Sequence, residues 1–222
     1  MSDYEPCDYS SYNDFFTRKI KAEKRPIPQA TNVLISPSDG KVSAYPIQKH
    51  SVFQIKGASY TVESLLKNRA LAEAFAEGYC VIIRLTVDDY HRYCYVADGV
   101  KGDNIAISGV FHTVNPVALQ YIPVYKENSR EYTVLQSTNF GEIIQMEVGA
   151  MMVGKISNYH QRKSVHKGQE KGCFEFGGSS IVLLLQKGGV HVAEDLLRNT
   201  EAGFETYVKM GDRLADAITL SS

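Results

Sequence analysis

The feature that most constrains the fold is a run of five apolar residues, 181–185, which follows the sequence Gly177-Gly178-Ser179-Ser180. A fully apolar run of this length, bounded by glycines, predicts a buried β-strand. Residues 80–85 form a second candidate for a buried strand. A chain with such strands must build a core around a sheet.

The remaining patterns also favour strands over helices. Short helices are predicted around residues 62–66 and 71–75, before Gly78, and over residues 191–197. Further strands are predicted at residues 33–35, 42–47, 105–114, 132–135 and 143–156. We therefore expect a β-rich α+β fold, a single domain with short peripheral helices.

Composition narrows the class of protein. The chain has 222 residues, of which 44% are hydrophobic and 22% charged, as in ordinary globular proteins. Its formal net charge of -1 gives no reason to expect a nucleic-acid partner. A dinucleotide-binding fingerprint and a P-loop are both missing from the sequence.

Cysteine usage and hydropathy bear on location. The four cysteines form no C-x-x-C pair, and the acidic, polar first residues do not resemble a secretory leader. We expect free thiols and a protein on the cytoplasmic side. No stretch reaches the roughly 18 apolar residues that span a bilayer, so any work on membranes must take place at their surface.

Residues 1–30 differ from the rest of the chain. Phe15, Phe16 and Ile20 lie among cations, which are Arg18, Lys19, Lys21, Lys24 and Arg25. Aromatic rings beside clustered cations can rest on an anionic lipid surface. The alternative is a solvated helix whose basic residues face water. We treat residues 1–30 as a candidate membrane-contacting segment.

Three side chains are candidates for catalysis. Asp39 lies in the turn Ser36-Pro37-Ser38-Asp39-Gly40, where an Asx turn is the ordinary alternative. His91 follows a predicted buried strand, in a place where catalytic residues concentrate, although a surface histidine is common there too. Ser179 follows two glycines at the mouth of a strand, as a nucleophile or as an ordinary turn residue. Together they supply the orienting group, base and nucleophile of an activated hydroxyl.

A metal site has weaker support. His91 and Cys94 form an H-x-x-C pair, but zinc needs at least one more protein ligand, and no second pair at suitable spacing exists. We expect no metal.

Several motifs, in one order, resemble the phosphatidylserine decarboxylase family over nearly the whole chain. Asp89-Tyr90-His91-Arg92 resembles the family's DYHR box, and Phe176-Gly177-Gly178-Ser179 resembles its cleavage motif. The other matching pieces are Asn13 to Lys21 with Arg25-Pro26-Ile27, Ser36 to Gly40, Ile55-Lys56-Gly57 with Tyr60 and Leu65-Leu66, Val114-Asn115-Pro116, Val148-Gly149-Ala150 and Lys171-Gly172.

The resemblance implies a self-processing, pyruvoyl-dependent decarboxylase. His91, oriented by Asp39, would take the proton of Ser179, whose oxygen would attack the Gly178 carbonyl. The chain would then split between Gly178 and Ser179, and Ser179 would become a covalent pyruvoyl group. That group would form a Schiff base with phosphatidylserine and yield phosphatidylethanolamine and CO2, with His91 as the candidate acid that protonates the product.

The resemblance also implies an organisation and partners. Residues 31–222 would form the catalytic domain, cleaved into a beta chain, 1–178, and an alpha chain, 179–222, that stay together as a heterodimer. A higher homo-oligomer stays open. The expected location is the cell membrane, peripherally, on the cytoplasmic side.

Two positions depart from the family pattern. Cys94 stands where many members have a second histidine, which leaves His91 to serve both proton transfers. Ser180 replaces the threonine that usually follows the cleaved serine and keeps a hydroxyl. The alternatives are a pyruvoyl decarboxylase for another amine, a non-catalytic lipid-binding relative and a serine hydrolase, although the G-x-S-x-G elbow of common hydrolases is missing.

Overall fold

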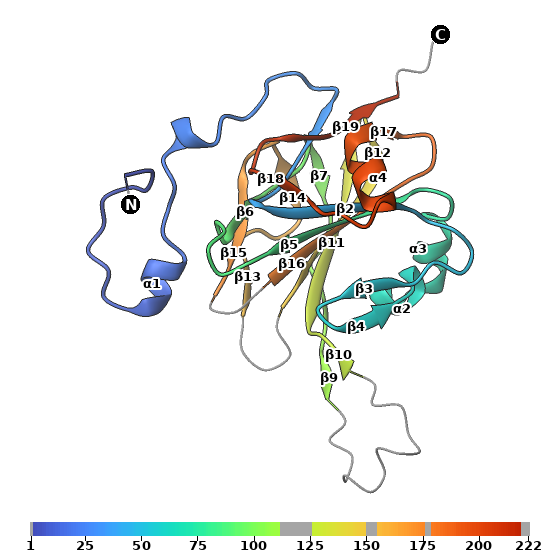
Figure 1. Cartoon of the computed structure of the whole chain (residues 1–222), viewed down its shortest axis with the longest axis horizontal. Coiled ribbons are helices and arrows are strands. Elements are labelled where there is room, and N and C mark those ends of the chain that lie inside the picture. The colour runs from blue at the N-terminus through green and yellow to red at the C-terminus, as the bar shows by residue number, and fades with distance from the viewer. Residues whose placement is uncertain (1, 112–125, 150–154, 176–178, 219–222) are drawn as a thin grey trace, which may run out of the picture.

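A computed structural model describes residues 2–111, 126–149, 155–175 and 179–218 (Figure 1). Within them the largest sheet has nine strands in the order β14-β7-β11-β12-β16-β5-β2-β18, with β8 also paired to β11. These strands are β2 (Gly40–Pro46), β5 (Tyr79–Leu85), β7 (Gly99–Lys101), β8 (Ile105–Ile107), β11 (Arg130–Ser137), β12 (Gly141–Val148), β14 (Lys163–Val165), β16 (Ser179–Leu185) and β18 (Thr206–Val208).

Smaller elements surround this sheet. One three-stranded sheet is β1 (Val33–Ile35), β19 (Arg213–Ala217) and β17 (Val190–Val192), and another is β13 (Ile156–Asn158), β15 (Glu170–Phe174) and β6 (Arg92–Cys94). Two pairs are β3 (Phe53–Ile55) with β4 (Ala58–Tyr60), and β9 (Val110–Phe111) with β10 (Lys126–Glu127). The helices are α1 (Tyr12–Phe16), α2 (Val62–Leu66), α3 (Arg69–Glu73), α4 (Glu194–Glu201) and the short 3-10 turn η1 (Ala22–Lys24).

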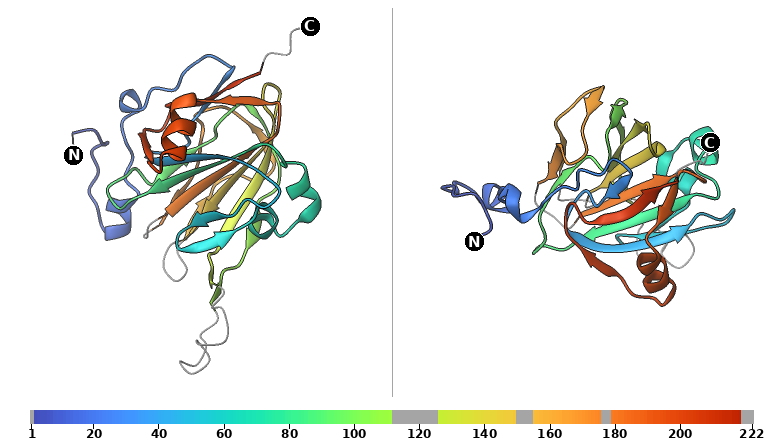
Figure 2. Two further views of the ribbon diagram at one scale, coloured as in Figure 1. Left: turned by 45° about the vertical axis from the view of Figure 1, so that its right-hand side comes forward. Right: turned by 90° about the horizontal axis from the view of Figure 1, so that it is seen from above.

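The large sheet is buried on both faces, and this explains why residues 181–185 of β16 are all apolar. Ile181, Leu183 and Leu185 pack into one core with residues of β1, β6 and β19. Val182 and Leu184 point the other way, into a second core with the β3–β4 hairpin and α2. Because successive side chains of a strand alternate between faces, a segment that contributes to a core on each face is apolar at consecutive positions. Figure 2 shows these layers from two further directions.

The expected β-rich α+β fold is confirmed. The predicted strands at 33–35, 42–47, 80–85, 132–135 and 181–185 correspond to β1, β2, β5, β11 and β16. The predicted short helices before Gly78 are α2 and α3, and α2 begins with a capping box between Thr61 and Ser64. Of the predicted strands at 105–114 and 143–156, residues 112–114 and 150–154 lie outside the described residues.

One helix prediction is wrong at its start. Residues 191–197 were expected to form a helix, but His191 and Val192 belong to β17 and the helix begins at Glu194. Val190 and Val192 are buried while His191 is exposed, and this alternation fits a strand paired with β19.

A buried ion pair links β12 to β15. Lys171 Nζ lies 2.5 Å from Glu147 Oε2, and both side chains are fully buried. Lys171 also donates to the Asn158 side chain at 2.8 Å. Burial lowers the pKa of Lys171 and raises the pKa of Glu147, although their mutual attraction opposes both shifts.

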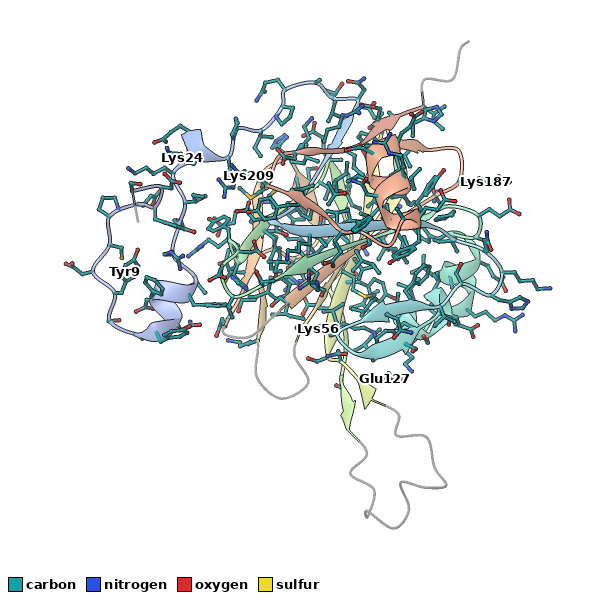
Figure 3. All side chains as sticks on the ribbon, in the orientation of Figure 1. Tyr9, Lys24, Lys56, Glu127, Lys187 and Lys209 are labelled. Atoms are coloured by element: carbon teal, nitrogen blue, oxygen red, sulfur yellow. The ribbon has the colours of Figure 1, made fainter. Side chains whose placement is uncertain are left out.

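Lys171→Met is expected to lower the free energy of unfolding by about 3–5 kcal/mol, because it leaves the Glu147 charge buried without its partner. The measurement is urea unfolding in a Ser179→Ala background, where the chain is expected to stay in one piece. The control is Lys187→Met, which removes the ion pair with Glu77 at the molecule's edge, where both side chains are about two-thirds exposed (Figure 3). That variant should unfold like its parent, and equal losses in both variants would contradict the account.

Candidate active site

The strand register places Asp39 and Ser179 at the same end of the large sheet. Ser179 is the first residue of β16 and pairs with Leu85, the last residue of β5. Asp39 directly precedes β2, whose Lys41 pairs with Arg84 on the other side of β5. The two candidates therefore flank the end of one central strand, although 139 intervening residues separate them in sequence.

His91 reaches the same end of the sheet through the chain that follows β5. The carbonyl of His91 accepts a hydrogen bond of 2.9 Å from the N–H of Phe174, where β15 ends. Three residues later, the N–H of Cys94 donates to the carbonyl of Pro37 at 2.9 Å, in the turn that carries Asp39. The backbone thus ties His91 to the segments that lead to Ser179 and to Asp39. Gly178, the other half of the predicted cleavage site, lies outside the described residues.

The imidazole of His91 is arranged as a base. Its Nδ1 lies 2.8 Å from the carbonyl oxygen of Asp89, a contact that requires a proton on Nδ1. The other nitrogen, Nε2, is then an acceptor; it is buried and has no hydrogen-bond partner among the described residues. Burial lowers the pKa of His91, against the effect of the Asp89 carbonyl. A neutral imidazole with a free lone pair can accept a proton.

Asp39 is held by a different partner from the one predicted. Arg25 donates to its carboxylate from Nε at 2.7 Å and again from a terminal nitrogen, and the N–H of Met210 adds a bond of 2.8 Å. The Asp39 carboxylate raises the pKa of Arg25. Among the described residues no hydrogen bond joins Asp39 to His91, whose Nδ1 is held by Asp89. The orienting contact expected from the sequence is therefore not made in this conformation.

The N-terminal segment packs directly on the site. The ring of Phe16 in α1 is buried against the imidazole of His91, with centroids 4.0 Å apart. Arg92 Nε donates to the carbonyl of Thr17 at 2.6 Å. Sequence reasoning placed Phe16 and Arg25 at a lipid surface, whereas the structure turns both toward the protein. The motif spacing carried no signal of these contacts.

Ser179 and Ser180 are both buried. Ser180 lines a cavity of about 220 Å³ whose wall includes Ser43 of β2 and Ile82 of β5. The lining also includes Lys56, in the turn between β3 and β4. Ser179, the residue before Ser180, is not among the lining residues, and its side chain points to the other face of the strand, so the cavity adjoins residue 179 through the backbone of β16.

Cys94 contributes no charge to the site. Its side chain is buried in β6, and burial raises the pKa of the thiol to about 12. In the described part of the chain, no group of three histidine, cysteine or acidic side chains is placed to hold a metal ion. All four cysteines are free thiols, as the sequence predicted.

Comparison with known proteins gives a consistent picture. The family model described as phosphatidylserine decarboxylase matches residues 12–216. Phosphatidylserine decarboxylase proenzyme 2 of Clostridium acetobutylicum is 47% identical over 216 residues, which cover 97% of this chain and 74% of the relative. The proenzymes of Clostridium novyi and Clostridium tetani are each 43% identical over 210 residues, covering 93% of this chain and 71% of the relative.

Proposed function

Because the chain belongs to the phosphatidylserine decarboxylase family, we propose that this enzyme converts phosphatidylserine to phosphatidylethanolamine and CO2 with a pyruvoyl group made from Ser179. The observation that carries the proposal is the family match over residues 12–216, which includes Asp39, His91 and Ser179. The pyruvoyl carbonyl would form a Schiff base with the serine headgroup and withdraw the electrons released as CO2 leaves.

The residues around Ser179 fit such a group. Ser179 is buried at the start of β16, and the next residue, Ser180, lines the cavity. Two buried polar atoms, His91 Nε2 and Lys56 Nζ, have no hydrogen-bond partner among the described residues. Burying a polar atom without a hydrogen bond costs free energy unless a ligand or a reacting group supplies the missing partner.

In the proposed self-cleavage, Nε2 of His91 takes the proton of the Ser179 hydroxyl. The Ser179 oxygen then attacks the carbonyl carbon of Gly178, and the peptide C–N bond breaks as an ester forms and the proton passes from His91 to the departing nitrogen. Loss of the Ser179 α-proton breaks the bond between Cβ and the ester oxygen, which frees the Gly178 carboxylate. Water then replaces the nitrogen of the resulting dehydroalanine, ammonia leaves, and residue 179 keeps two adjacent carbonyl groups. In the decarboxylation, we propose His91 as the acid that returns a proton to the substrate carbon.

The two fragments are expected to stay together as a heterodimer. In residues 179–222, β16 lies between β5 and β12, β18 pairs with β2, and β19 pairs with β1. All of these partners belong to residues 1–178. Separation would break these ladders and expose both cores, so cleavage of one peptide bond should leave the fold intact.

We further propose that residues 1–30 contact the membrane, on its cytoplasmic side. The exposed rings of Tyr12 and Phe15 lie in α1, beside the buried Phe16 that covers His91. The exposed Lys19 follows, so one short segment offers both rings and a cation to a lipid surface. None of the helices within the described residues is long and apolar enough to cross a bilayer.

The direct test of the function uses vesicles that contain phosphatidylserine. The purified chain should release CO2 and form phosphatidylethanolamine, and Ser179→Ala should do neither. Turnover of a soluble amino acid in place of phosphatidylserine would favour a pyruvoyl decarboxylase for another amine. Vesicle binding by an uncut, inactive wild-type chain would favour a lipid-binding relative.

Asp39→Asn tests whether Asp39 orients His91. Orientation requires a rearrangement from the observed pairing with Arg25, so the carboxylate itself should matter more than its present partner. We expect Asp39→Asn to slow self-cleavage by about 10²- to 10⁴-fold. Arg25→Gln, which keeps the carboxylate, should cleave within a few-fold of wild type. Equal slowing in both variants would assign Asp39 to anchoring the N-terminal segment instead.

A further inference from the structure

Lys56 has an unusual backbone position. It and Gly57 form the two-residue turn between β3 and β4, with φ angles of 52° and 75°. A turn with two positive φ angles favours asparagine, aspartate or glycine at its first position, because a Cβ is strained there. A lysine at this position places its long side chain at the tip of the hairpin, against the local preference.

The amine of Lys56 is buried and unpaired. Its Nζ has no hydrogen-bond partner among the described residues. By contrast, the buried Lys101 donates to the Gly102 carbonyl, and Lys171 is paired with Glu147. Burial lowers the pKa of Lys56 to about 8, with no opposing effect from a nearby anion. A buried ammonium of this kind is unfavourable until an anion accompanies it.

The position of Lys56 connects this amine to the candidate active site. Lys56 and Ser180 line the same cavity of about 220 Å³. Its charge also contributes to the lowered pKa of His91, so the two groups interact electrostatically. Figures 1 and 2 show the tip of the β3–β4 hairpin beside the beginning of β16, and Figure 3 labels Lys56 there.

Among the described residues that line the cavity, Lys56 is the cation that remains available to a ligand. The other cation, Arg84, already donates to both carboxylate oxygens of Glu205, at 2.8 and 2.5 Å. Ser43 and Ser180 can supply hydroxyl groups beside the amine. This is the chemistry of a site for one compact anion, bound by a point charge and neutral donors.

We propose that Lys56 binds the phosphate of the phospholipid headgroup and so holds the serine portion next to residue 179; this rests on the proposed function. The headgroup also carries a carboxylate, but that group departs as CO2. A cation on the carboxylate would stabilise the substrate more than the transition state, whereas a cation on the phosphate acts equally on both. Lys56 is therefore assigned to binding, not to the bond that breaks.

The test compares Lys56→Met, Lys56→Arg and the exposed control Lys187→Met. All three should still be processed into the two fragments. Lys56→Met should raise KM for phosphatidylserine by about 10- to 100-fold with a much smaller change in kcat, as expected for a lost charged hydrogen bond. Lys56→Arg should recover most of the loss, and Lys187→Met should show none. An unchanged KM in Lys56→Met, with or without a loss of kcat, would overturn the proposal.

A binding measurement separates this proposal from the proposed function. Calorimetry on the uncut Ser179→Ala chain compares glycerophosphoserine with O-methylserine, which lacks the phosphate, and with inorganic phosphate. Adding Lys56→Met should weaken the binding of glycerophosphoserine by about 10- to 100-fold and leave the binding of O-methylserine unchanged. Inorganic phosphate should bind the Ser179→Ala chain more weakly than glycerophosphoserine does, and Lys56→Met should abolish that binding. Equal effects on glycerophosphoserine and O-methylserine would overturn the role of Lys56 even if the enzyme decarboxylates phosphatidylserine.

Discussion

Ser179→Ala is expected to leave a single uncut polypeptide with no decarboxylase activity. The hydroxyl oxygen of Ser179 is the proposed nucleophile, and its Cα and Cβ become the pyruvoyl group, so no other residue can replace it. The loss should therefore be complete rather than partial. The measurement is a denaturing gel of the purified chain together with the assay on phosphatidylserine vesicles.

Ser180→Ala is the matched control for this prediction. Ser180 is also buried, lies next in the same strand and pairs with Arg84. Its hydroxyl has no role in the proposed cleavage, so Ser180→Ala should process normally. Cleavage in Ser179→Ala, or a block in Ser180→Ala alone, would show that Ser179 is not the nucleophile.

His91→Ala is expected to slow self-cleavage by about 10²- to 10⁴-fold, the usual contribution of a positioned general base. The precursor should therefore persist long enough to follow its decay in a time course after synthesis. The exposed His191 provides the control, since His191→Ala removes an imidazole from β17 without touching the site. Wild-type kinetics in His91→Ala would exclude His91 as the base.

The pH dependence of cleavage should report the same group. A base must be neutral to accept a proton, and burial lowers the pKa of His91 below its ordinary value of about 6.5. The neutral form therefore persists as the pH falls from 8 toward 6.5. The rate of cleavage should therefore fall to half of its maximum only at a pH below 6.5.

The sequence predicted those parts of the molecule that depend on local patterns. The apolar run 181–185 identified the central strand β16, since a segment that packs into a core on each face of a sheet is apolar at consecutive positions. Glycine, histidine and aspartate motifs pointed to Ser179, His91 and Asp39. Strand register places Ser179 and Asp39 at one end of the sheet, and backbone hydrogen bonds bring His91 to the same end. The helix expected from residue 191 failed because pairing of β17 with β19, a tertiary contact, decides that segment.

Other parts of the site depend on contacts that no local pattern encodes. Arg25 reaches Asp39 across 14 positions without an intervening helix or repeat, and its place in a basic cluster suggested lipid instead. The group that holds His91 is a backbone carbonyl, which every residue has. Lys56 belongs to a recognised motif, but its lack of a partner appears only when its neighbours are placed around it.

The central claim is that the chain converts Ser179 into a pyruvoyl group by cutting itself, and the most direct test is the intact mass of the purified wild-type protein. We expect two fragments, 1–178 and 179–222, with the smaller one beginning in a pyruvoyl group and both remaining associated under native conditions. A single unmodified chain, from protein shown to be folded, would contradict it.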